Sequence, residues 1–197
     1  WIAAYTGSFW VAVVAGVAIA FVVGLLLENV FIRRLYGRDH LVQVLLSFGL
    51  ILVIDEVRQL LFGKDVHSVL PPEGLRGAIQ LTDNLSYPVY RLAICGFCLV
   101  AAAIIYLVIT RTKIGMIVRA GAENREMTRT LGINFDTVNR YVFAVGIALA
   151  ALAGIIVAPV STVYPGMGDS MLILSFVVVV LGGIGSIGGA AIGALLI

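Results

Sequence analysis

Charge is scarce in this sequence, because Asp, Glu, Lys and Arg make up 12% of its 197 residues while hydrophobic residues make up 61%. The mean hydropathy is +1.09. A water-soluble protein carries most of its charge on its surface, so this balance excludes a water-exposed globular chain and indicates a lipid-embedded one. The net charge of +2 is also too small to indicate a nucleic-acid partner.

Cysteine and histidine are equally scarce, with two of each. Cys95 and Cys98 form a C-x-x-C inside an apolar run, where a thiolate is costly, so we expect small apolar side chains rather than a redox or zinc site. His40 and His67 lie in separate polar segments and cannot share a metal ion. The sequence therefore predicts no metal and no cofactor.

Catalytic patterns are missing as well. The uncharged runs contain no Ser/His/Asp group and no paired carboxylates, so they lack the catalytic residues that an intramembrane enzyme would need. The segment "FGKD" at Phe62 to Asp65 has a Gly-Lys pair without the rest of a Walker A motif. We therefore predict a non-enzymatic chain and place any ATP hydrolysis on another subunit.

Long uncharged runs are abundant, and each is long enough for a transmembrane helix, which needs about 20 apolar residues. Such runs must be helical, because lipid offers no partner to open backbone groups. The fold class predicted is an all-α polytopic transmembrane helical bundle in a single membrane-embedded domain covering 1–197. The expected spans are Phe9–Leu27, Leu41–Leu61, Val89–Ile109, Tyr141–Val163 and a fifth region, Ser170–Ile197.

The ends of the chain also fall in apolar sequence. It begins on Trp1 without an initiator Met and stops inside "IGALLI". We therefore expect it to be a piece of a longer membrane protein.

The polar connections differ in charge, which predicts their sidedness. The segment 28–40 has three Arg against two acidic residues, and the segment 110–140 has five Arg and one Lys against three acidic residues. Segment 63–91 is balanced at three against three. Since cytoplasmic loops carry the Lys/Arg excess, we predict that 28–40 and 110–140 face the cytoplasm and that the loop 63–88 faces outward. The outer loop contains a candidate β-hairpin turning near Asp83 and Asn84.

The stretch "RAGAENREMTRTLGI", Arg119 to Ile133, lies in the most basic of these segments. Asn124 is a suitable N-cap, Arg125 to Leu131 can form two helical turns, and Gly132 can end them as a left-handed C-cap. A helix so short needs a surface to pack against. It is either a surface helix docked on the protein's own spans or a projection presented to a cytoplasmic partner.

The same segment carries a family resemblance when it is combined with "YPGMG" and "LGGIGSIGGA" farther along the chain. From roughly Leu25 to Ile197 the sequence resembles the membrane permease subunits of ABC importers for branched-chain amino acids. Glu126 and Gly132 keep the Glu-to-Gly spacing of the coupling motif of such permeases. Met127 and Thr128 stand where the motif has an Ala pair, and its Leu-Pro ending is absent.

The resemblance implies that the short helix is a coupling helix. Its implied contact residues for a cytoplasmic ATP-binding subunit are Asn124, Arg125, Glu126, Arg129, Leu131 and Gly132. It also implies a second permease subunit and an extracytoplasmic solute-binding protein.

The glycine-rich run "GGIGSIGGAAIG" contains the spacing G-x-G-x-x-G at Gly183, Gly185 and Gly188. A dinucleotide site also needs a preceding strand and an acidic residue about 20 positions later, and neither fits an uncharged membrane segment. We therefore do not interpret this run as a cofactor site.

Two interpretations of the run remain open. In the first, Gly185, Gly189 and Gly193 repeat every four residues and let another helix approach closely. In the second, the helix breaks or re-enters near Ser186 and exposes backbone groups to a polar path. A helix over 170–197 would be about 42 Å long, more than the hydrocarbon core, which favours a break or re-entrant segment.

Asp55, Glu56 and Arg58 lie in the outer third of the second expected span. An ionisable residue in a span suggests a function, but near the interface its cost is much smaller, so we favour interface anchoring over a role in the path. Ser47 and Gly49 lie deeper and are better candidates. The predicted translocation path comprises Ser47, Gly49, Gly182, Gly183, Gly185 and Ser186.

Together with these features, the resemblance implies the permease subunit of an ATP-driven importer for branched-chain or similar hydrophobic amino acids, in a plasma membrane of the bacterial inner-membrane type. Urea or short amides are alternative solutes. The main alternative function is an ion- or proton-coupled secondary transporter or channel. That mechanism would need a titratable group at the bilayer midplane, and the expected spans show none.

Overall fold

The structure is a computed structural model that describes residues 9–35, 39–63, 72, 77–82, 85–123, 125–130, 132, 134–161, 163–164, 166–183 and 186–196. The chain forms two compact units. The first comprises Trp1–Tyr90 and Asn139–Pro165, and the second comprises Arg91–Val138 and Gly166–Ile197.

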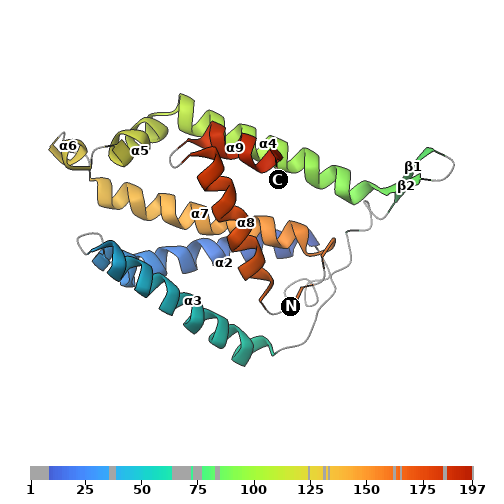
Figure 1. Cartoon of the computed structure of the whole chain (residues 1–197), viewed down its shortest axis with the longest axis horizontal. Helices are drawn as coiled ribbons and strands as arrows, with labels where there is room; N and C mark the ends of the chain where they lie inside the picture. The colour runs from blue at the N-terminus through green and yellow to red at the C-terminus, as the bar shows by residue number, and fades with distance from the viewer. Residues whose placement is uncertain are drawn as a thin grey trace. The chain divides into compact units, whose positions relative to one another are not determined.

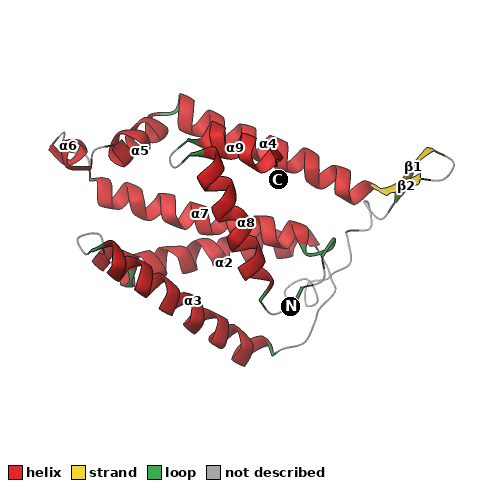
Figure 2. Ribbon diagram, in the orientation of Figure 1, coloured by secondary structure: helices red, strands yellow, loops and turns green. Residues whose placement is uncertain are grey.

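Helices account for the described elements apart from one pair of strands, which confirms the predicted all-α class (Figure 1, Figure 2). In chain order the elements are α2 (Phe9–Val30), the 3₁₀-helix η1 (Ile32–Leu35), α3 (His40–Phe62), β1 (Ala78–Thr82), β2 (Leu85–Pro88), α4 (Val89–Arg111), α5 (Lys113–Glu123), α6 (Arg125–Thr130), α7 (Phe135–Val157), α8 (Met167–Gly182) and α9 (Ile187–Leu196).

Three segments of the described chain are long and apolar enough to cross a membrane: Phe9–Leu35, Val89–Arg111 and Asp136–Val157. Helix α3 has 23 residues but carries three charged residues in its second half and is not among them. Helix α8 is apolar and shorter, with 16 residues. The apolar side chains of these helices are largely exposed, as expected for helices whose surroundings are lipid or further helices.

Small residues set the packing of α2 against α7 in the first unit. A Cβ added at Gly24 would lie 2.9 Å from the Ala144 Cα, and one added at Gly16 would lie 2.6 Å from the Ile155 Cδ1. Gly16, early in α2, contacts Ile155 late in α7, and Gly24, later in α2, contacts Ala144 early in α7, so the helices run antiparallel. Ala144 is fully buried and Ala148 is 7% exposed. Without larger side chains between them, the two backbones approach closely, as is typical of membrane helices.

Helix α7 lies six residues toward the N-terminus of the predicted span Tyr141–Val163. It begins earlier because Asn134 caps it, with the backbone N–H of Thr137 3.3 Å from the Asn134 Oδ1. It ends earlier because Pro159 cannot donate a backbone hydrogen bond and disfavours helix in the residue before it. The predicted span began after Arg140 because that residue ends the charged segment, but Arg140 lies inside the helix.

Helix α2 extends past Leu27 to Val30, so Glu28 and Asn29 are helical rather than part of the predicted connection. The chain then continues into η1, where the Phe31 N–H donates to the Leu27 oxygen over 3.0 Å. The Gln43 Nε2 of α3 donates to the Leu35 oxygen over 3.1 Å. This hydrogen bond joins η1 to the first turn of α3.

The predicted hairpin is present as the antiparallel pair β1 and β2, with Ala78 opposite Pro88 and Thr82 opposite Leu85. Asp83 and Asn84, where the turn was predicted, lie outside the described residues. The Val89 N–H donates to the Gly77 oxygen over 2.9 Å, which joins the base of the hairpin to the start of α4.

Helix α5 was not predicted, because the segment 110–140 that contains it was expected to hold one short helix. Gly115 and Gly121, both buried, lower the helix propensity of this stretch and masked its pattern. Gly115 is needed where it is, because an added Cβ there would collide with the Ile109 oxygen at the end of α4. The close turn from α4 into α5 therefore depends on the absence of a side chain.

Candidate functional site

The predicted coupling segment contains α6, which lies along the chain between α5 and the start of α7. Helix α6 covers Arg125–Thr130, and the Thr130 hydroxyl donates to the Met127 oxygen over 2.7 Å in its last turn. Gly132 then has φ +78°, the left-handed conformation that the sequence predicted for a residue ending this helix. Asn134 caps α7 two residues later, so α6 is joined to α7 by a very short connection.

The side chains of α6 show two contrasting environments. Thr128 is 2% exposed, whereas Met127 is 62% exposed. Thr128 therefore faces the protein, while Met127 presents an apolar side chain outward. A buried face explains how so short a helix is held, and an exposed apolar residue leaves a surface for a partner.

Several predicted coupling residues cannot be placed in this way. Asn124 and Leu131 lie outside the described residues, and so do the side chains of Arg125, Glu126 and Arg129. Their proposed roles therefore remain predictions, and the backbone of α6 and the conformation of Gly132 are what the structure adds.

The glycine-rich run forms a helical hairpin in the second unit. Helix α8 ends at Gly182, Gly183 has φ +84° and ψ 130°, and α9 begins at Ile187. A Cβ added at Gly189 would lie 2.8 Å from the Gly182 carbonyl carbon and closer still to its oxygen, and one added at Gly193 would lie 3.0 Å from the Val178 oxygen. Helix α9 thus folds back antiparallel along the end of α8.

The two sequence interpretations of this run therefore combine. The helix does break near Ser186, and Gly189 and Gly193 do permit close packing, with α8 as the neighbour. Ser186 caps α9, because the Gly189 N–H lies 3.0 Å from the Ser186 Oγ and the Ala190 N–H donates to the Ser186 oxygen over 2.9 Å. Gly185 lies outside the described residues.

Ser47 and Gly49, the other predicted path residues, lie on exposed surface of α3 in the first unit. The Ser47 hydroxyl donates to the Gln43 oxygen over 2.8 Å, within its own helix. An added Cβ at Gly49 would meet nothing within 4 Å. The structure leaves both open to a neighbour, and Gly182, Gly183 and Ser186 belong to the other unit.

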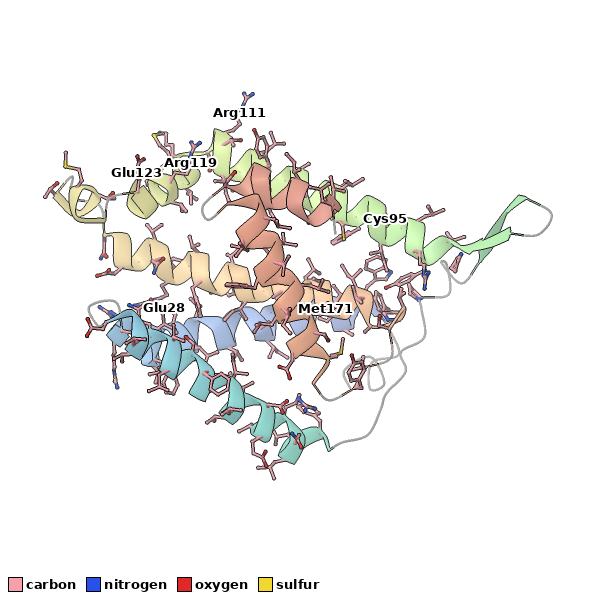
Figure 3. All side chains as sticks on the ribbon, in the orientation of Figure 1. Glu28, Cys95, Arg111, Arg119, Glu123 and Met171 are labelled. Atoms are coloured by element: carbon pink, nitrogen blue, oxygen red, sulfur yellow. The ribbon has the colours of Figure 1, made fainter. Side chains whose placement is uncertain are left out.

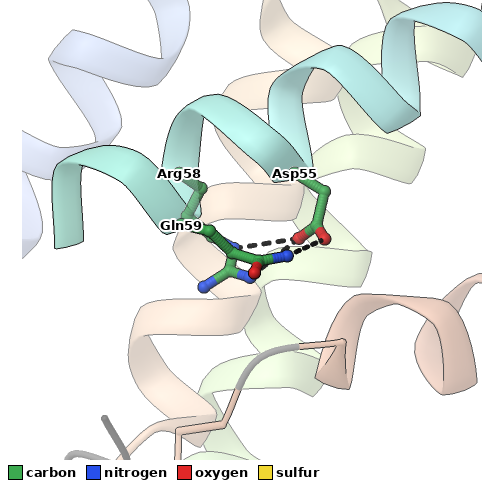
Figure 4. A network of polar contacts seen from close by, with 3 residues as sticks. All are labelled: Asp55, Arg58 and Gln59. Carbon is green, nitrogen blue, oxygen red and sulfur yellow. Dashed lines mark hydrogen bonds and ion pairs between the residues drawn. The ribbon is translucent and has the colours of Figure 1, made fainter. Parts of the chain in front are cut away.

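Asp55, Arg58 and Gln59 form a network of polar contacts along one face of α3, shown in Figure 4. The Arg58 Nη2 and Nε lie 2.8 and 3.0 Å from the Asp55 Oδ1, and the Gln59 Nε2 lies 3.0 Å from the Asp55 Oδ2. The Arg58 and Asp55 side chains are 35% and 46% exposed. Because each charge is compensated within the helix, this network fits the interface anchoring that the sequence favoured.

Sequence reasoning missed a second charged cluster, which joins α2 to α7. Glu28, labelled in Figure 3, is fully buried in the last turn of α2. The Arg140 Nε lies 3.4 Å from the Glu28 Oε2, and the Arg140 Nη2 lies 3.3 Å from the Asn29 Oδ1. In the sequence, Glu28 and Arg140 were assigned to the segments 28–40 and 110–140 between spans, and they entered only the charge count of those segments.

The two cysteines are free and exposed on α4. Among the residues that the structure describes, no three His, Cys, Asp or Glu side chains come together as a metal site.

The full length of the chain, residues 1–197, matches the family model described as "Branched-chain amino acid transport system / permease component". The chain belongs to this family. The membership agrees with the resemblance stated from "AENREMTRTLGI" and "LGGIGSIGGA", and with a helical body built around long apolar helices.

Curated proteins of the same kind are similar to the chain over most of its length. It is 29% identical over 191 residues to the high-affinity branched-chain amino acid transport system permease protein BraD of Pseudomonas aeruginosa, a match covering 94% of this chain and 62% of BraD. It is 29% identical over 197 residues to the corresponding protein LivH of Escherichia coli K12, covering 95% of this chain and 63% of LivH.

A shorter match links the chain to an archaeal relative. The probable branched-chain amino acid transport permease protein LivH of Methanocaldococcus jannaschii is 32% identical over 93 residues, which is 47% of this chain and 30% of that protein. The chain thus spans 62% and 63% of the length of BraD and of the Escherichia coli LivH. No solved structure matches it significantly.

Proposed function

We propose that this chain is the translocation part of a permease subunit in an ATP-driven importer for branched-chain or similar hydrophobic amino acids. The observation that carries the proposal is the family match over residues 1–197, supported by BraD and LivH, which are named as branched-chain amino acid permeases. The chain itself would not be an enzyme. A separate cytoplasmic subunit would hydrolyse ATP, since the sequence has no Walker A motif.

The coupling site would be α6 with its flanking residues, docked in a groove of the ATP-binding subunit. Two observations support this role. The segment 110–140 is the most basic of the chain, which favours the cytoplasmic side, and Met127 is exposed on a helix otherwise anchored by Thr128. Asn124, Arg125, Glu126, Arg129 and Leu131 would supply further contacts, and Gly132 would set the exit angle toward α7.

Transport would proceed by alternating access, in which ATP-driven closure of the ATP-binding subunits displaces α6 and tilts the membrane helices. The predicted path residues Ser47, Gly49, Gly182, Gly183, Gly185 and Ser186 are small. Such residues allow helices to slide without large side chains locking them. The α8–α9 hairpin supports a place on the path, because broken helices within a membrane occur where they line a cavity or are buried in protein.

Two further partners complete the proposed assembly in a plasma membrane of the bacterial inner-membrane type. A second permease subunit would cover the exposed apolar helices together with lipid. A solute-binding protein would dock outside, on the loop 63–88 that contains β1 and β2. Its delivery of solute would supply much of the specificity, so the path itself need not hold a tight site.

The coupling role can be tested with the double variant Glu126→Ala and Arg129→Ala in the complete transporter. The measurements are co-purification of the ATP-binding subunit and ATP-dependent amino acid uptake in proteoliposomes. We expect both to fall strongly. The matched control is Lys113→Ala with Glu123→Ala on α5, which removes one basic and one acidic exposed residue from the same segment.

Normal co-purification and normal uptake in the Glu126/Arg129 variant would remove α6 as the coupling element. The same vesicles distinguish the alternative function. Uptake by the wild type that follows a proton or sodium gradient and ignores ATP would identify a secondary transporter instead.

A further inference from the structure

Glu28 is the most completely buried charged residue in the described part of the chain, with 0% exposure. Its carboxylate meets Arg140, whose side chain is 33% exposed and therefore reaches from the packed interior toward the surface. The same guanidinium also contacts Asn29. One side chain of α7 thus holds two successive residues in the last turn of α2.

Stability alone does not account for a buried charge at this position. A carboxylate in the last turn of a helix meets the negative end of the helix dipole, which disfavours it. A buried ion pair also pays a large desolvation cost, so apolar residues of similar volume stabilise a fold as well or better. What such a pair does provide is a defined register between two elements.

The pair lies close to the proposed coupling helix along the chain. Helix α7 begins at Phe135, so Arg140 follows it by about 7.5 Å of helical rise. Only Gly132 and its two neighbours, with the cap residue Asn134, separate α7 from α6. A displacement of α6 therefore reaches Arg140 within the first two turns of α7.

Further contacts next to the Glu28–Arg140 pair extend the packing of α2 on α7 and link α2 to η1 and α3. The Gly24–Ala144 contact lies one turn farther along both helices and leaves no space between the backbones. In the other direction, η1 follows α2 directly and accepts the Gln43 hydrogen bond from α3 at Leu35. Helices α2, α3 and α7 are thus linked by polar contacts at one end of the first unit.

We propose that Glu28 and Arg140 are positioning residues for transport, which transmit the displacement of α6 to α2 by holding α2 and α7 as one rigid pair. The inference rests on the proposed function, because it assumes that an ATP-binding subunit moves α6. Without the ion pair, α7 would shift relative to α2, and part of each ATP-driven movement would not reach the path.

The test uses the complete transporter in proteoliposomes, with ATP hydrolysis and amino acid uptake measured on the same sample. The variants are Glu28→Gln and Arg140→Gln. We expect each to assemble with its ATP-binding subunit and to hydrolyse ATP, while solute transported per ATP falls at least about fivefold. Arg140→Lys, which keeps the charge, should recover part of the ratio.

The matched control is Asp55→Asn with Arg58→Gln, which removes an ion pair that lies within one helix and joins no two elements. Its transport-to-ATP ratio should equal that of the wild type. A merely structural role for Glu28 and Arg140 would lower the amount of assembled complex and leave the ratio of the remaining complex unchanged.

A ratio within about twofold of the wild type in both glutamine variants would overturn the proposal. If those variants fail to assemble, the double variant Glu28→Gln with Arg140→Gln decides, because it removes the ion pair without leaving one buried charge unpaired. A ratio below the wild type supports the inference, and an equal ratio contradicts it. Failure of the proposed function is recognised separately, because the wild type would then show no ATP-dependent uptake at all.

Discussion

The Tyr90 hydroxyl, at the start of α4, lies 2.8 Å from the backbone oxygen of Ile156, at the end of α7. In a continuing helix the Ile156 oxygen would accept from Val160, but the Val160 N–H donates to Val157 instead. Because α7 ends at Val157, the Ile156 oxygen has no hydrogen-bond donor within the helix, and the Tyr90 hydroxyl donates to it instead. Tyr90 is 7% exposed, so water is a poor substitute for this hydrogen bond.

Tyr90→Phe should accordingly lower the free energy of unfolding by about 1–3 kcal/mol, the cost of a buried acceptor left without a donor. The measurement is a denaturant titration of the purified protein in mixed micelles. Tyr106→Phe is the matched control, because Tyr106 lies on the same helix and is 51% exposed. Equal effects of the two substitutions would show that the Tyr90 hydrogen bond contributes nothing specific.

The α8–α9 hairpin predicts opposite outcomes for two adjacent glycines. An Ala side chain at Gly189 would collide with the Gly182 backbone, whereas one at Gly188 would meet nothing within 4 Å. Gly189→Ala should cost about 1–3 kcal/mol of stability because the colliding atoms are backbone and cannot rotate away. Gly188→Ala should be neutral or stabilising by up to about 1 kcal/mol through helix propensity.

Comparison of the two variants in thermal unfolding and in the yield of folded protein checks this hairpin directly. Equal tolerance at both positions would mean that α9 does not pack on α8 as described.

The α2–α7 contact gives a graded prediction along one helix. Gly24→Ala should destabilise by about 1–3 kcal/mol, because the new methyl would press on the Ala144 backbone. Gly16→Ala should cost less, since its contact is the movable end of the Ile155 side chain. The free energies of unfolding in mixed micelles should therefore rank wild type, Gly16→Ala and Gly24→Ala in decreasing order. A reversed order would contradict the close approach at Gly24.

If Asp55, Arg58 and Gln59 only anchor α3 at the membrane interface, replacing Asp55 should have small effects on stability and on uptake. Because the ion pair is partly exposed and lies within one helix, Asp55→Asn should change the stability little. Uptake by the complete transporter should stay within about twofold of the wild type. A loss of uptake in Asp55→Asn at normal expression would instead place Asp55 on the solute path.

The sequence predicted those features that depend on local patterns. The expected spans began at Phe9 and Val89, where α2 and α4 begin, and an N-cap residue, a glycine and a turn signal located α6 and the hairpin. Boundaries shifted where a charged residue lay inside a helix, as Glu28 does in α2 and Arg140 does in α7. Helix α5 was missed because two glycines weakened its pattern.

Contacts between residues far apart in the chain could not be predicted from the sequence. The pairing of Glu28 with Arg140 and of Tyr90 with Ile156 depends on how α2, α4 and α7 pack, and no local pattern encodes that. The sequence left open both a break near Ser186 and close packing at the glycine repeat, but not α8 as the neighbour, because a repeat of small residues does not say which helix it will meet.

The proposed coupling requires that α6 lies on the cytoplasmic side of the membrane, where the ATP-binding subunit can bind it. Met127→Cys tests this, in a background where Cys95 and Cys98 are replaced by Ala, because Met127 is 62% exposed. The exposed Gly77, beside the hairpin, gives the opposite reporter as Gly77→Cys. Both are treated with a membrane-impermeant maleimide in vesicles of known orientation.

We predict that Cys at position 127 reacts only in inside-out vesicles and is protected when the ATP-binding subunit is bound, while Cys at position 77 reacts only in right-side-out vesicles. Reaction at position 127 in right-side-out vesicles, or no reaction in either orientation, would contradict the account.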